Sequence, residues 1–275
     1  LLDGRPRLVE RDRARSTILR PACRHGPAAG RRRRARPPGV LHVVGDEPDP
    51  MQALKRVLEG GAHQVTLFEQ REFASSGALK PAAILMYVHE ELEESVGKRL
   101  IAFTREGGRL IILHHGIASA KNKSPYWMEF VGMEILPKNA PEYPWAVIYG
   151  VEFEMVNLAP GHPVTTQQVN YTGTTAYSRS EPPQSREQNL SSFVVPDTEA
   201  YLNQRFRPGQ QRTLLFGMKC KDPVGGAVYM QDTGGWVMKA GKGWMFYLQP
   251  GHFGRDFEVP QLRQVLLNCL SWKAR

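Results

Sequence analysis

Two adjacent histidines follow a short apolar segment of the chain. Arg109–Leu113 comes directly after two glycines and is rich in Leu and Ile, which predicts a buried strand. His114 and His115 stand at its carboxyl end, before Gly116 and a helix expected to begin at Ser124-Pro125. Ligands of open α/β sheets bind at this edge, so the pair could do acid–base or metal chemistry there. The alternative is that one histidine only caps the strand.

Other reactive side chains follow other expected strands. His89 comes after the apolar segment 82–88, and His252 follows segment 244–248 within Gln249-Pro250-Gly251-His252. Segment 197–201 is expected to be a loop able to fold over the sheet edge. Histidines that meet at one sheet edge suit a transition-metal site or an acid–base site. A hydrogen-bonded polar cluster is the structural alternative.

The elements that must position these residues form two different halves. In the first half, expected strands 40–44, 63–68, 82–88 and 109–113 alternate with helices, of which the first has Asp49 as its predicted N-cap. This alternation predicts a parallel sheet with helices on both faces. The second half contains expected strands 146–153, 214–218 and 225–231, a hairpin (236–240 and 244–248) around Gly241-Lys242-Gly243, and a closing helix (260–273). The polar segment 172–187 is expected to be an insertion or a lid.

The charge of the chain is concentrated at its N-terminal end. The 275 residues carry a net charge of +9, and segment 1–39, with twelve arginines and three acidic residues, accounts for all of it. We expect a disordered arm here, without specific nucleic-acid binding. An organelle transit peptide is conceivable, and the composition is also that of GC-rich DNA read upstream of a start, so the arm need not belong to the native protein. The expected folded domain is 40–275.

Several classes of function are disfavoured by missing motifs. The chain contains no GxxxxGK, no GxGxxG after the first strand and no GxSxG, so we expect no nucleotide cofactor and no hydrolase elbow. No apolar run is long enough to span a membrane, and three widely spaced cysteines suit a reducing compartment, so a cytoplasmic location is expected.

An ordered set of motifs resembles the ThuA-like (trehalose utilisation) family. The set is GGRLIILHHGIAS, PGHPVT, VPDTEAY, AGKGWMFYLQPGH and LLNCLSWKA, in this order, and the resemblance covers about 40–275. The resemblance implies a flavodoxin-like three-layer α/β sandwich with a mostly parallel central sheet, as in class I glutamine amidotransferases. Amidotransferases carry a cysteine after the strand that matches 110–113. Because His114 stands there, we expect no amidotransferase reaction.

The resemblance also implies where the site lies. His114 matches the family's histidine after the glycine-rich strand. Glu199 and Tyr201 match the glutamate and tyrosine of its E-x-Y segment. His252 matches the histidine of the glycine-histidine pair that follows its hairpin. His162, in the GHP turn, is expected to be structural. The expected function is processing of a small-molecule carbohydrate, such as trehalose, a related glycoside or a keto-sugar. The alternative is a non-catalytic carbohydrate-binding or accessory subunit.

The expected catalytic residues are His114, Glu199 and His252, and the expected substrate-binding residues are His89, His115 and Tyr201. Whether a metal is bound is left open; the catalytic trio could hold a divalent transition metal. The oligomeric state is also open, and a homo-oligomer is compatible with the sequence.

Overall fold

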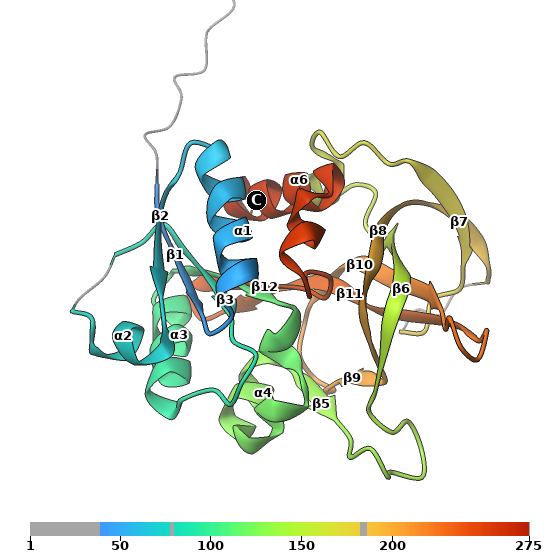
Figure 1. Cartoon of the computed structure of the whole chain (residues 1–275), viewed down its shortest axis with the longest axis horizontal. Helices are drawn as coiled ribbons and strands as arrows, with labels where there is room; N and C mark the ends of the chain where they lie inside the picture. The colour runs from blue at the N-terminus through green and yellow to red at the C-terminus, as the bar shows by residue number, and fades with distance from the viewer. Residues whose placement is uncertain (1–38, 78–79, 182–185, 275) are drawn as a thin grey trace, which may run out of the picture. The chain divides into compact units, whose positions relative to one another are not determined.

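The computed structural model describes residues 39–77, 80–181 and 186–274. The prediction of a disordered arm therefore lies outside the described residues. Within them, the main feature is a ten-stranded mixed sheet in the order β2-β1-β3-β4-β12-β11-β10-β6-β8-β7 (Figure 1). A separate two-stranded sheet pairs β5 (Met133–Ile135) with β9 (Gln204–Phe206).

One half of the large sheet is parallel, as the sequence predicted. Its strands are β2 (Gln64–Phe68), β1 (Val40–Gly45), β3 (Ala83–Tyr87), β4 (Arg109–Leu113) and β12 (Gly243–Leu248). Each pairs in parallel with its neighbour in this order. Ala83–Tyr87 of β3 and residues 110–113 of β4 are buried and almost wholly apolar because helices cover both faces.

The other half of the sheet is antiparallel, so the expectation of a mostly parallel sheet was wrong. Its strands are β11 (Val228–Ala240), β10 (Thr213–Lys221), β6 (Ala146–Asn157), β8 (Gln188–Leu202) and β7 (Gly173–Tyr177). The change of direction occurs at the tight turn between β11 and β12, since a hairpin can join only antiparallel strands.

Three local expectations also fail in the antiparallel half. Segments 225–231 and 236–240 belong to one long strand, β11. Part of the expected insertion or lid is an edge strand, β7, paired with β8. The segment around Glu199 is not a loop, because β8 continues through it to Leu202.

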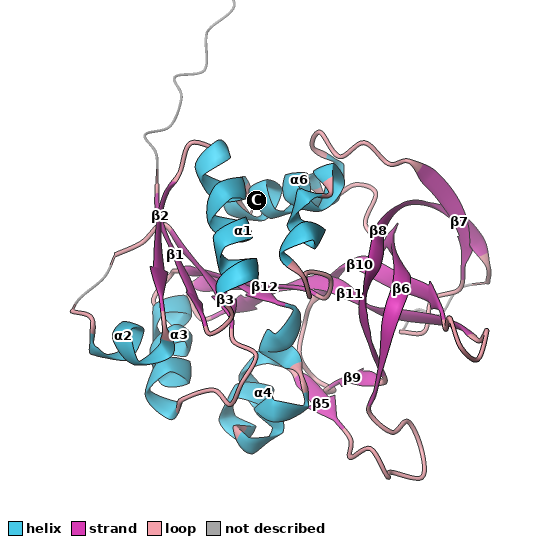
Figure 2. Ribbon diagram, viewed as in Figure 1, coloured by secondary structure: helices cyan, strands magenta, loops and turns pink. Residues whose placement is uncertain are grey.

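The helices cover the parallel half on both faces (Figure 1). On one face, α1 (Pro48–Gly60) and α6 (Pro260–Ser271) pack in one apolar cluster. On the other, α2 (Gln70–Ser75), α3 (Glu94–Arg105) and α4 (Pro125–Val131) pack in a second one. A short α5 (Pro163–Thr166) follows β6 in the chain, and the 3-10 turns η1 (His114–Ile117), η2 (Ser119–Lys123) and η3 (Gly254–Glu258) complete the elements. Figure 2 colours helices and strands separately and shows the helices on either side of the sheet. In the described part of the chain, no helix is long and apolar enough to cross a membrane.

The start of α1 differs from the prediction by two residues. Glu47 is the N-cap and Pro48 opens the helix, whereas the Asp49 carboxylate accepts a hydrogen bond from the Gly254 amide at 3.1 Å. Asp49 therefore ties the first turn of α1 to η3. Four neighbouring strands, β1, β3, β4 and β12, run parallel, so the residues that follow them meet at one edge of the sheet.

Candidate active site

His114 stands at a sharp turn between β4 and η1. Its φ of +37° is unusual for a residue with a side chain, and such strain is found where surrounding contacts enforce it. The Trp127 indole donates to the Gly116 carbonyl at 2.9 Å, and the Tyr247 hydroxyl donates to the His114 carbonyl at 3.1 Å. A Cβ at Gly116 would lie 2.3 Å from Ile112, so only glycine fits here. These contacts hold His114 at the strand end.

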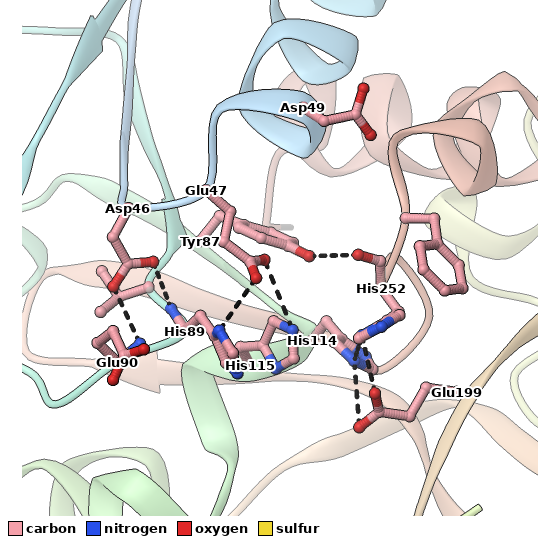
Figure 3. Close-up of polar contacts among 12 residues, drawn as sticks. Asp46, Glu47, Asp49, Tyr87, His89, Glu90, His114, His115, Glu199 and His252 are labelled. Atoms are coloured by element: carbon pink, nitrogen blue, oxygen red, sulfur yellow. Dashed lines mark hydrogen bonds and ion pairs between the residues drawn. The ribbon is translucent and has the colours of Figure 1, made fainter. Parts of the chain in front are cut away.

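His114, Glu199 and His252 meet as a connected chain of side chains (Figure 3). Nδ1 of His114 lies 2.6 Å from the Gln249 carbonyl oxygen and so donates to it. Nε2 of the same ring is 3.2 Å from Nδ1 of His252, and His252 Nδ1 is 2.8 Å from Oε2 of Glu199. Oε1 of Glu199 lies 3.8 Å from Nε2 of His114. The trio is therefore close enough to share a proton or a substrate oxygen.

The charges of the Glu199 carboxylate and the neighbouring imidazoles stabilise each other. Burial raises the pKa of Glu199, but the imidazoles of His114 and His252 outweigh burial and hold it at about 2. Burial lowers the pKa of His252, and the Glu199 carboxylate more than compensates, so the pKa of His252 is raised above its ordinary value. A buried carboxylate that stabilises an imidazolium is the arrangement that catalytic histidines use.

His252 is the member of the trio that reaches solvent. Its side chain is 19% exposed, whereas His114 and Glu199 are buried. Gly251, with φ of +121°, packs so tightly on Phe257 that a Cβ would lie 2.7 Å from its ring. The Tyr87 hydroxyl donates to the His252 carbonyl at 2.7 Å. The loop after β12 therefore presents the His252 ring at the surface in one orientation.

Tyr201 and His115 lie behind the trio rather than at its surface. Tyr201 is 1% exposed, its ring stacks on His114 with centroids 4.4 Å apart, and its hydroxyl lies 2.6 Å from Nδ1 of His115. Burial lowers the pKa of His115 far below its ordinary value, and the neighbouring histidines add to this effect. Both residues support the imidazoles from inside the protein, and a direct contact of either with substrate stays a prediction.

Glu47 is a site residue that the sequence reasoning missed. It follows β1, and its carboxylate lies 3.0 Å from Nδ1 of His89 and 3.6 Å from Nε2 of His115 (Figure 3). The available signal was an acidic pair, Asp46-Glu47, at the carboxyl end of the first strand, the same edge as His89. Acidic residues after a strand are also typical of a solvated surface loop, so this pair does not stand out in the sequence.

Lys121 and Asp46 fix the segment that carries His89. The buried Lys121 ammonium donates to the carbonyls of Val88, His89 and Glu90 at 2.6–3.0 Å. Asp46 accepts hydrogen bonds from the amides of His89 and Glu90 at 2.6 and 2.9 Å. Burial lowers the pKa of Lys121 to about 8. The loop after β3 is thus held by charged groups of its neighbours.

Other residues that could carry chemistry cap a helix or lie in the core. His162 accepts a hydrogen bond from the Val164 amide at 3.2 Å and caps α5, which confirms its structural role. Trp127, Trp145 and Trp236 are buried in the core. The described cysteines, Cys220 on β10 and Cys269 on α6, are buried free thiols that lie on elements other than the turn after β4.

Comparison with known proteins agrees with this architecture. The chain matches the model of the family ThuA, trehalose utilisation, over residues 42–273. No curated protein sequence gives a significant match. Among solved structures, a ThuA-like protein of Bacteroides uniformis superposes with a TM-score of 0.58 at 15% identity, covering 86% of this chain and 92% of its own.

Two further structures show the same fold at low identity. A protein of Salmonella typhimurium described as cytoplasmic has a TM-score of 0.50 at 12% identity, covering 84% of this chain and 98% of its own. Agd3, described as a carbohydrate deacetylase, has a TM-score of 0.51 at 11% identity, covering 85% of this chain but 33% of its own. The family match spans nearly all of the described residues: the chain belongs to the ThuA (trehalose utilisation) family.

Proposed function

We propose that this protein is an enzyme that moves a proton next to the carbonyl group of a small-molecule carbohydrate, with His252 as the proton carrier. The observation that carries the proposal is the connected chain Glu199–His252–His114 at the carboxyl edge of the parallel strands. The family match supports a carbohydrate-related role in general terms, and the reaction itself is our inference from the geometry.

The roles within the trio follow from exposure. Glu199 is buried, and its oxygens face two imidazoles, so it is placed to orient His252 and to stabilise the imidazolium. His252 contacts both partners through Nδ1, which leaves Nε2 to accept the proton of a C–H bond beside a carbonyl. The electrons of that bond move onto the carbonyl oxygen and form an enediolate, and return of the proton completes the exchange.

The experiment follows deuterium exchange by NMR. A panel of keto-sugars is incubated with the protein in D2O, and deuterium incorporation next to the carbonyl is recorded; trehalose, which has no carbonyl group, is the negative control. We expect exchange with at least one keto-sugar, reduced roughly 10²–10⁴-fold in His252→Ala. The matched control is His63→Ala, because His63 directly precedes β2 and so lies at the opposite edge of the sheet. Equal exchange in wild type and His252→Ala would contradict the proposal.

The second candidate is a non-catalytic carbohydrate-binding subunit on the same fold. The burial of His114, His115 and Tyr201 favours it, because a rigid polar cluster needs no substrate to explain it. Calorimetric titration with the same sugars separates the two candidates. Binding of a sugar without exchange or turnover would favour the subunit.

A further inference from the structure

Beside the trio lies a second cluster of side chains that the proposed reaction does not use. It consists of Glu47 after β1, His89 after β3 and His115 after β4 (Figure 3). Each offers one atom that can bind a metal ion, and these three atoms all lie within 4.8 Å of one another. The three residues come from adjacent strands, so the sheet itself holds their spacing.

The distances in this cluster suit a shared ion. Oε1 of Glu47 is 3.0 Å from Nδ1 of His89, and Oε2 is 3.6 Å from Nε2 of His115. A transition metal about 2.1 Å from each donor holds neighbouring donors roughly 3.0–3.5 Å apart in tetrahedral or octahedral geometry. All three donors lie within 4.8 Å of one another, so an adjustment of the partly exposed Glu47 and His89 side chains would bring them to a common ion.

His115 supplies a second observation, because its Nε2 is buried and has no hydrogen-bond partner among the described residues. A buried polar atom without a partner destabilises the folded state. If Nδ1 carries the proton and donates it to the Tyr201 oxygen, Nε2 presents a lone pair that faces a carboxylate. If Nε2 carries the proton, 3.6 Å to Glu47 is too long for a hydrogen bond. An ion pair between Glu47 and His89 leaves this atom unsatisfied in either case.

The surroundings of the cluster resemble those of a ligand shell. The Tyr201 hydroxyl holds the second nitrogen of His115, as outer partners of metal-binding histidines do. Asp46 and Lys121 fix the backbone of His89. His89 is 47% exposed and Glu47 30% exposed, so the solvent side is open to water or to a substrate oxygen.

We propose that Glu47, His89 and His115 bind one divalent first-row transition metal and leave open coordination positions toward solvent. Two imidazoles and one carboxylate favour Zn²⁺, Co²⁺, Mn²⁺ or Fe²⁺ over Ca²⁺ and Mg²⁺. The open positions would take vicinal oxygens of a polyhydroxy compound. The site stands independently of the proposed proton transfer, because none of its ligands belongs to the trio.

The test measures metal binding itself on the untagged full-length chain. After dialysis against a chelator, Co²⁺ is titrated in, and binding is followed by calorimetry and by the visible absorption of bound Co²⁺. We expect about one ion per chain, with affinity reduced roughly 10–100-fold or more in Glu47→Gln and in His89→Ala. Both side chains are partly exposed, so these variants should fold, and circular dichroism checks this.

Two control variants match the ligands in type. Glu69 is the N-cap of α2 as Glu47 is that of α1, and His63 directly precedes β2 at the far edge of the sheet. Glu69→Gln and His63→Ala should bind Co²⁺ like the wild type. Binding unchanged in Glu47→Gln and His89→Ala, or no Co²⁺ uptake by the wild type, would overturn the proposal. Binding lost only in His252→Ala would also overturn it, because it would place the ion among His114, His115 and His252.

Discussion

At the scale of single residues, Glu199 links the stability of the protein to pH. Its pKa is about 2 in the folded protein against an ordinary value of 4.5, so its stabilisation is complete above pH 4.5 and lost as pH falls toward 2. The raised pKa of His252 has the opposite sign: its contribution is complete below pH 6.5 and lost as pH rises through the raised value.

We therefore predict that Glu199→Gln lowers the free energy of unfolding most between about pH 4.5 and 6.5. The loss there should be on the order of 2–3 kcal/mol, and it should shrink toward pH 2–3, where wild-type Glu199 begins to be protonated. Denaturant unfolding of both proteins at several pH values, with a chelator present, measures the difference. A difference that stays constant from pH 3 to pH 6 would contradict the assignment of the low pKa to Glu199.

Lys121 gives a second prediction at this scale. Lys121→Met keeps the length of the side chain but removes three hydrogen bonds to the carbonyls after β3. Buried acceptors left without partners should lower the free energy of unfolding by about 2–4 kcal/mol. Lys123→Met is the control, because the Lys123 side chain is exposed and pairs only with Glu91 in the contacts of the described residues. Urea unfolding compares the two, and equal, small losses would show that Lys121 does not hold the loop.

At the scale of elements, the turn between β4 and η1 depends on Gly116. A Cβ there would lie 2.3 Å from Ile112 and 2.8 Å from Met86, both buried, so Gly116→Ala must displace the turn or the strands. We predict a loss of about 1–3 kcal/mol in the free energy of unfolding. Gly161→Ala, with no atom within 4 Å of the added Cβ, should change it little. Thermal melting of both variants checks this, and two equal melting temperatures would contradict the packing argument.

The elements also show why sequence predicted one half of the sheet better than the other. Apolar segments such as 109–113 sit between helices, and their composition alone marks them as buried parallel strands. In β6 and β10, register shifts near Val151 and Phe216 break the alternation of inward and outward residues. Pro196 and Asp197 are residue types that favour a loop in the Glu199 segment, because both are rare inside strands. Even so, β8 continues through them.

The same difference applies to the site. His114, His252 and Glu199 could be named because they follow or adjoin recognisable motifs, and the structure brings them together. Glu47 could not be named in the same way, because an acidic residue in an expected loop is most often a solvated surface group. Its proximity to His115 depends on strand order, which places β1 next to β3 and β3 next to β4.

At the scale of the whole molecule, the site requires both halves of the sheet. His89, His114 and His115 come from the parallel half, and Glu199 and Tyr201 come from β8 in the antiparallel half. The Gln249 side chain connects the halves, because it accepts a hydrogen bond from the Tyr201 amide at 3.0 Å and donates to the Thr233 carbonyl at 3.2 Å. The proposed reaction therefore depends on the complete fold and not on the β4 turn alone.

The last prediction is that the protein does not release ammonia from glutamine, because the turn after β4 carries no thiol. Release of ammonia from glutamine needs an activated thiolate attacking the carboxamide, and here His114 occupies the turn. Burial raises the pKa of the Cys269 thiol to about 12 and that of the Cys220 thiol to about 11, so neither is activated. We predict no glutamine-dependent ammonia release in a coupled ammonia assay. Release that is abolished by Cys220→Ser would show that the nucleophile lies on β10, and release that survives replacement of all three cysteines by serine would show that no thiol is needed.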